Sequence, residues 1–270
     1  MKTNYKTFRS TLLALALVTV FLPTSVMALG RTPQMSVNQS DAIPITAPDL
    51  NGSATKKPVN WAGANMAGAH LSGRNLQGAI LTGAILTGAN LYNADLTGAN
   101  LNGANLNGAI LNNANLSGGA KLIGAILTNA NLSNAHLVQS NLTGAILTGA
   151  ILTNADLTMS LLSGANLTDA NLSGTNLFVA NLTGANLTDA NLTDANLDSA
   201  ALTDANLKGA NLSGANLPNT AMGGTNLYGA MMTDTDTSAI SWGSNTKCPD
   251  GTYSQDNGGT PRCNAVNLRY

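Results

Sequence analysis

Few side chains in this sequence could support acid–base, nucleophilic or metal chemistry, and their spacing does not bring them together. The 270-residue chain has two histidines, two cysteines and thirteen acidic residues, all of them Asp. Catalysis requires an acid, a base or a nucleophile to converge on one point. His70 and His136 lie far apart and, in the register described below, on different sides of a coil. We therefore expect no catalytic residues and no enzyme activity.

The C-terminal region holds the remaining candidates for chemistry. Cys248 and Cys263 cannot supply the four ligands of a structural zinc site. In an exported chain two cysteines favour a disulfide, and two free thiols are the alternative. Asp250, Asp256 and Asn257 could offer oxygen atoms to calcium, but their spacing is not that of an EF-hand, and loop solvation explains them better. We expect neither a metal nor a cofactor.

Leucine recurs every fifth residue through most of the chain. In "GANLTDANLTDANL", residues 184–197, it does so three times. A helix repeats near 3.6 residues and a strand repeats every 2, so neither explains this period. The period runs from Met66 to Leu116, gains one residue at Gly118–Gly119, resumes at Leu122 and continues to Met232. A short fixed period over this length predicts a repeat architecture.

Alanine stands two residues before nearly every leucine, and the other positions are small, polar or Gly. Residues two apart in extended backbone face the same side, so each unit points Ala and Leu inward. The remaining residues are turn formers. A turn every five residues coils the chain, and successive coils can pair through parallel backbone ladders. The sequence thus predicts a solenoid with a Leu and Ala core and a polar surface. At Gly118–Gly119 we expect a bulge that keeps Leu116 and Leu122 inside.

The units "ANLTG", "ADLTG" and "ANLSG" resemble the A(D/N)LXX pattern of the pentapeptide-repeat family over roughly two thirds of the chain. The resemblance implies an all-β fold, a right-handed quadrilateral parallel β-helix with four units per coil and about nine coils. The residues alone do not fix the number of sides. Hydroxyl residues follow the leucines so often that a twenty-residue period is hard to separate from fifteen.

The N-terminus has the pattern of a secretory signal. Basic residues precede the apolar stretch 11–22, and small residues at Val26 and Ala28 suit cleavage after Ala28. An uncleaved anchor is the alternative, but the stretch is short for a membrane span of about 20 residues. We expect export to the periplasm or beyond, with no stable membrane span after cleavage. The expected organisation is a signal peptide 1–28, a polar linker 29–58, a β-helix 59–237 and a C-terminal cap with a disulfide tail 238–270.

The two tryptophans of the chain both fall on leucine positions, one near each end of the repeat. Trp61 lies five residues before Met66, and Trp242 lies ten after Met232. The open ends of a solenoid expose core and strand edges, which require caps. A tryptophan covers more area than a leucine. We therefore predict that Trp61 and Trp242 are end caps, the alternative being chance.

The position before each leucine is normally Asn or Asp and should face solvent. Seven residues break this rule: Ile80, Ile85, Ile110, Ile126, Ile146, Ile151 and Leu161. In a four-sided register, five of them gather on two neighbouring faces. The first face would carry Ile85, Ile126 and Ile146, and the second Ile110 and Ile151. Exposed apolar clusters can mark partner surfaces, so these five form a candidate interaction surface. Scattered aliphatic residues on turn surfaces are an equally good explanation.

Two further surface features allow other functions. Hydroxyl residues form columns, Thr128, Thr148, Thr168 and Thr188 on one face and Ser133, Thr153, Ser173 and Thr193 on another, as on ice-binding solenoids. Acidic residues gather late in the repeat, at Asp169, Asp189, Asp194, Asp198 and Asp204. Some pentapeptide-repeat proteins mimic DNA and act on gyrase through an acidic rod. That charge is weak here beside a DNA duplex, and an exported protein would not meet gyrase.

The leading hypothesis is therefore an exported, non-enzymatic β-solenoid that acts as a scaffold or protein-interaction surface for an unknown protein partner. A DNA-mimic regulator of a topoisomerase such as gyrase is the main alternative. A cell-surface or ice-active protein is the third. Nucleic acid itself is an improbable partner, because only 9% of the residues are charged and the net charge is −1.

Overall fold

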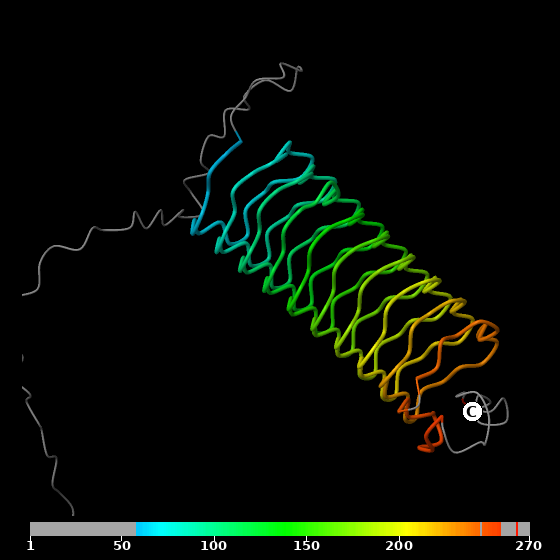
Figure 1. Ribbon diagram of the computed structural model, residues 1–270. Coiled ribbons are helices and arrows are strands. Elements are labelled where there is room, and N and C mark those ends of the chain that lie inside the picture. Colours follow the sequence, from blue (N-terminus) through cyan, green and yellow to red (C-terminus); the bar gives the residue numbers. More distant parts are fainter. Residues whose placement is uncertain (1–57, 244, 255–262, 264–270) are drawn as a thin grey trace, which may run out of the picture. The chain divides into compact units, whose positions relative to one another are not determined.

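The computed structural model describes residues 58–243, 245–254 and 263. The chain divides into two units, Met1–Pro33 and Gln34–Tyr270, and all described residues belong to the second. These residues form a straight rod of stacked coils (Figure 1). The expected signal peptide and almost all of the expected linker lie outside the described residues. Within the described part, no helix has the length and apolarity needed to span a bilayer.

Each coil pairs with the next through parallel bridges between residues 20 apart, and every coil contributes four of them. The rod therefore has four sides, and the twenty-residue period is the correct one. Side 1 carries the bridges from Asn60 to Ser241, and side 2 those from Asn65 to Lys247. Side 3 runs from His70 to Met231, and side 4 from Asn75 to Asp236. The expected ladders are present, but each is only one residue wide. The described residues contain isolated bridges, no helix and no strand of several residues.

A tight turn joins each side to the next, and its hydrogen bonds explain the repeat. The carbonyl of each leucine accepts the N–H three residues later, as Ala170 N–H donates to Leu167 O over 3.0 Å. The second residue after the leucine has a positive φ, as at Asp169 (57°), which is the pattern of a type II turn. The Asn before the leucine accepts the N–H two residues on, as Thr168 N–H donates to Asn166 Oδ1 over 3.1 Å. This bond explains the preference for Asn and Asp there.

The leucines and alanines of the repeat fill the interior. From Leu81 to Leu227 every Leu and Met at the leucine position is 0% exposed, and the alanines two before are at most 1% exposed. The inside–outside assignment made from the period is thereby confirmed. No coil could bury its four leucines alone, so each coil depends on both neighbours for its stability.

The extra residue is absorbed at a single corner. Gly118 and Gly119 both have positive φ, 64° and 76°, a conformation that Gly adopts without strain. The pairing distance rises to 21 residues from Asn100↔Lys121 to Asn115↔His136 and then returns to 20 until the last parallel bridge, Asn226↔Lys247, where it is again 21. Leu116 and Leu122, on either side of the insertion, are both 0% exposed. The expected bulge is confirmed.

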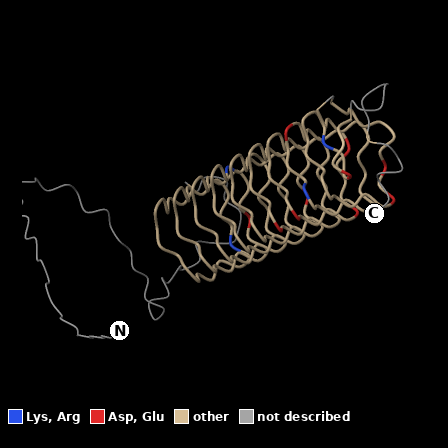
Figure 2. Cartoon of the chain, turned by 90° about the horizontal axis from the view of Figure 1, so that it is seen from below, with Lys and Arg blue, Asp and Glu red and all other residues tan. Residues whose placement is uncertain are grey.

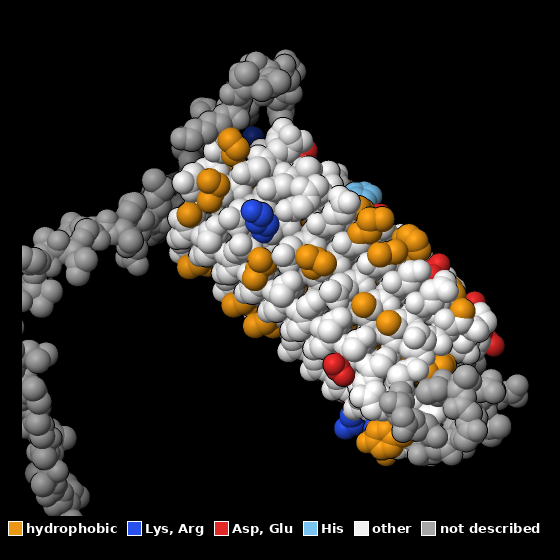
Figure 3. Space-filling model, in the orientation of Figure 1, with side chains coloured by type: hydrophobic (Ala, Val, Ile, Leu, Met, Phe, Trp, Pro, Cys, Tyr) orange, Lys and Arg blue, Asp and Glu red, His pale blue; other side chains and the backbone are white. Residues whose placement is uncertain are grey.

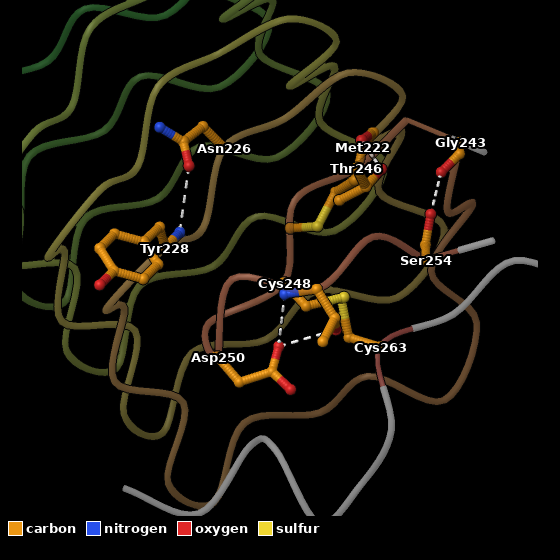
Figure 4. The surroundings of a disulfide bond; sticks show 10 residues. Met222, Asn226, Tyr228, Gly243, Thr246, Cys248, Asp250, Ser254 and Cys263 are labelled. Atoms are coloured by element: carbon orange, nitrogen blue, oxygen red, sulfur yellow. Dashed lines mark hydrogen bonds between the residues drawn. A yellow bond between two sulfur atoms is a disulfide. The ribbon is translucent and has the colours of Figure 1, made fainter. Parts of the chain in front are cut away.

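Regular pairing continues beyond residue 237, the expected end of the repeat. Ser241 bridges Ala221, and Lys247 bridges Asn226. Cys248 then takes the leucine position of side 2 in the last coil, where it is 0% exposed. Cys263 is bonded to it, which places the disulfide against the end of the core (Figure 4).

Both tryptophans occupy the leucine positions at the ends of the rod. Trp61 belongs to the first coil on side 1, and Trp242 to the last. Each is half-buried and packs against the core cluster.

Candidate functional site

The side chains with reactive groups are dispersed over the rod. His70 lies on side 3 and His136 on side 4, several coils apart. The carboxylate of Asp250 accepts hydrogen bonds from the N–H and the hydroxyl of Thr252, at 2.9 and 2.8 Å (Figure 4). Asp256 and Asn257, the other calcium candidates, lie outside the described residues. Within the described ranges no group of three His, Cys, Asp or Glu side chains could hold a metal ion.

The isoleucines of the candidate interaction surface lie on two adjoining sides of the rod. Ile85, Ile126 and Ile146 occupy side 2, with Asn105 between the first two. Ile110 and Ile151 occupy side 3, with Asn131 between them. Ile126 is half-buried, and the other four are 39–42% exposed. On the face shown in Figure 3, hydrophobic side chains form separate groups among uncharged polar ones.

Beyond these isoleucines the same two sides change character. On side 2, Asn206 Nδ2 donates to Asn186 Oδ1 over 3.3 Å, and Asn226 Nδ2 donates to Asn206 Oδ1 over 3.1 Å. On side 3, Asn191 Nδ2 donates to Asn171 Oδ1 over 3.3 Å. These bonds form asparagine ladders along the later coils. The earlier coils give up such ladders for exposed isoleucine, which marks the first part of sides 2 and 3 as the more apolar surface.

The later hydroxyls of the two columns, those of Thr168, Ser173, Thr188 and Thr193, are engaged within the rod. Thr168 Oγ1 donates to Asn166 Oδ1 over 2.7 Å and accepts from Asn186 Nδ2 over 2.9 Å. Thr188 is held in the same way by Asn186 and Asn206. Hydroxyls that already donate and accept have little capacity left for an ordered water lattice, so their arrangement serves the ladder.

The late acidic residues surround the rod and do not line one face. Asp169 and Asp189 share the corner after side 2. Asp194, Asp198 and Asp204 lie at the corners after sides 3, 4 and 1 respectively. Figure 2 shows the acidic residues spread over several parts of the coils. A mimic of a DNA backbone needs charge repeated along one surface, and this distribution does not provide it.

The carboxyl group of Asp95 has a pKa that its surroundings shift. Burial acts to raise the pKa of Asp95, but hydrogen bonds from Thr97 and Gln77 outweigh it, so the pKa lies below its ordinary value. Gln77 Nε2 donates to Asp95 Oδ2 over 2.5 Å, and the Thr97 hydroxyl donates to Oδ1 over 2.6 Å. Asp95 replaces the usual Asn of side 4 and accepts the same turn hydrogen bond that Asn115 accepts one coil later.

The structure also reveals an apolar surface that sequence reasoning missed. It lies at the corner between sides 4 and 1, and we call it the apolar corner. Its residues come from successive coils: Val138, Met159, Leu161, Phe178 and Val179. Leu161 stands before a leucine, and Val138 and Phe178 stand directly after one. Met159 and Val179 stand two residues after a leucine, where Gly, Asn and Asp otherwise predominate.

Comparison with known proteins gives a consistent picture of the repeat. A family model described as pentapeptide repeats matches the chain in eight copies, which cover residues 64–103, 89–126, 125–164, 152–178, 170–209 and 205–236. No curated protein sequence matches the chain.

Three solved structures illustrate the similarity. HetL, a pentapeptide repeat protein involved in heterocyst differentiation regulation in the cyanobacterium Nostoc, is 32% identical over 72% of this chain and 91% of its own, with a TM-score of 0.32. A pentapeptide repeat protein from the Arabidopsis thaliana thylakoid lumen is 32% identical over 47% and 70%, with a TM-score of 0.21. QnrB1, a plasmid-mediated fluoroquinolone resistance protein, is 20% identical over 62% and 83%, with a TM-score of 0.45.

Proposed function

Because the chain belongs to the pentapeptide-repeat family, we propose that it is an exported, non-enzymatic scaffold that binds a protein partner along sides 2 and 3 of its rod. The rod is taken as right-handed, with about nine coils, as the family implies. Export rests on the N-terminal signal pattern, and Trp61 and Trp242 serve as end caps in this proposal. With both ends covered, the partner binds along the length of the rod.

The exposed isoleucines are the observation that carries this proposal. Asn at the same position completes the turn and extends the ladder, as Asn186 does on side 2. Ile126 and Ile146 give up both contributions and place an apolar side chain at the surface. An exposed isoleucine at a position where Asn would stabilise the fold indicates a binding role.

The test replaces isoleucine by the residue that the repeat itself prefers. Ile126→Asn with Ile146→Asn should preserve or raise the melting temperature and abolish capture of the partner from an envelope extract. The matched control is Ile80→Asn, the same change on side 1, where Ile80 is 39% exposed. If the double variant captures the same protein as the parent chain, the partner does not bind sides 2 and 3.

Location and a gyrase assay separate this proposal from its main alternative. The mature protein should be recovered from the periplasm or the medium, with its first residue after Ala28. The purified protein should leave DNA supercoiling by gyrase unchanged. Cytoplasmic protein that inhibits or protects gyrase would support the DNA-mimic function and would contradict the proposal.

A further inference from the structure

Four consecutive coils depart from the turn chemistry of the rod at one corner. Among the residues that the structure describes, fifteen other than glycine have a positive φ between 53° and 59°. Eleven of them are Asn or Asp, which tolerate this conformation. The four exceptions are spaced twenty residues apart at the corner between sides 4 and 1: Gln139, Met159, Val179 and Ser199.

Two of these residues are poorly suited to the conformation that they adopt. A positive φ is a steric outlier for a β-branched or bulky side chain. Val179 nevertheless has a φ of 56° and Met159 a φ of 57°, and they are 42% and 46% exposed. Their side chains stabilise the fold little, since they bury little apolar area. Strained residues with exposed apolar groups are typical of a surface with a binding function.

The fold supports this corner with extra hydrogen bonds. Ser140 and Ser160 replace the usual alanine after Gln139 and Met159, and both are fully buried. Each donates its hydroxyl over 2.7 Å to the carbonyl that already accepts the turn N–H, Leu137 O or Leu157 O. A second donor to the same carbonyl stabilises a turn that lacks glycine.

Polar groups of complementary character frame the apolar corner. His136 lies on side 4 in the coil of Val138, at one end, and its imidazole is exposed. Asp198 lies at the other end, three coils further on. Ser199 Oγ and Asn219 Nδ2 both donate to Asp198 Oδ1, at 2.8 and 3.3 Å. The hydrogen bonds to Asp198 are thus concentrated on one carboxylate oxygen.

We propose that the apolar corner binds a second copy of this chain, side by side and antiparallel, around a two-fold axis between the coil of Met159 and the coil of Val179. The axis brings Met159 of one copy onto Phe178 and Val179 of the other. Within one copy, His136 and Asp198 lie three coils apart, which is about 15 Å along the rod. The axis also brings each His136 opposite Asp198 of the second copy. An apolar centre with a polar rim is the usual anatomy of such an interface.

His136 and Asp198 decide between a parallel and an antiparallel arrangement of the two rods. A parallel pair would place equal coils together and oppose Asp198 to Asp198. An antiparallel pair opposes an imidazole N–H donor to a carboxylate at both ends of the contact, which is favourable. Because this contact lies on other sides of the rod from Ile126 and Ile146, it is independent of the partner binding proposed above.

The first test uses the full mature chain in sedimentation velocity and light scattering, over a dilution series that reaches about 100 μM. The parent chain should dimerise. Met159→Asn with Val179→Asn should raise the dissociation constant at least about tenfold. Asn154 adopts the same turn conformation, so this variant should melt no lower than the parent. Ile85→Asn with Ile146→Asn is the matched control and should dimerise normally.

The second test determines the orientation without altering the apolar residues. Asp198→Arg should weaken the dimer, and His136→Glu added in the same chain should restore it. In a parallel dimer the added change would not restore it, because residues 136 and 198 would stay apart. A parent chain that is monomeric throughout the series overturns the proposal, as does an Asn double variant that dimerises like the parent.

Discussion

Each interior leucine packs against residues of its own coil and of the two neighbouring coils. A substitution at one leucine should therefore have a large effect on stability. Leu167 is 0% exposed, and Leu167→Asp would bury an unpaired carboxylate. We expect it to lower the free energy of unfolding by about 4 kcal/mol or more. The control is Asn171→Asp on the outside, with a change within about 0.5 kcal/mol. Chemical denaturation measures both, and equal losses would contradict the inside–outside assignment.

Asp95 makes stability depend on pH. Because its pKa is lowered in the folded chain, its contribution is fully present above the unfolded pKa of about 3.9 and is lost as the pH falls through the folded pKa. Asp95→Asn keeps the turn acceptor that Asn115 provides one coil later. The variant should therefore show a weaker loss of melting temperature below about pH 4. Identical acid profiles for both proteins would show that the carboxylate contributes nothing to folding.

At the scale of one corner, the rod should accept the removal of its extra residue. Deletion of Gly119 converts residues 114–120 into regular repeat units and restores the pairing distance of 20. We expect an unchanged or higher melting temperature. Deletion of Gly184 removes a residue from a regular turn, so the leucines that follow would lose their places, and this variant should melt much lower. Circular dichroism melts compare the two, and comparable losses would mean that the insertion is required.

The corners also show what the sequence could predict and what it could not. The five-residue period predicts that Leu and Ala are buried, because alternate residues of extended backbone point to the same side. It could not give the number of sides, since Ala–Asn–Leu is the same local unit at any corner count. Only the bridges between residues 20 apart decide it. The apolar corner was missed because Met159 and Val179 occupy a position that turn chemistry normally reserves for Gly, Asn or Asp.

At the scale of the whole rod, the ends limit stability. Trp242 is half-buried against the core, with the disulfide of the last coil near it in sequence. Trp242→Ala should uncover leucines and unpaired backbone, lower the melting temperature and produce assemblies larger than those of the parent in light scattering. Ile123→Ala is the control, since Ile123 is 43% exposed in the middle of the rod. If the two variants behave alike, Trp242 is not a cap.

Because one coil of four sides takes twenty residues, the residue number of a side chain determines the side of the rod on which it lies. Five residues advance the chain by one side, so inserting or deleting one unit rotates everything beyond it by a quarter turn relative to everything before it. Only an insertion or deletion of twenty residues changes the length of the rod and keeps the isoleucines of sides 2 and 3 and the apolar corner in the same relative orientation. A unit gained between Ile85 and Val138 would redirect the whole apolar corner relative to Ile85 and preserve the Leu and Ala pattern of the core. Mutation can therefore reorient the binding surfaces of such a rod in right-angle steps.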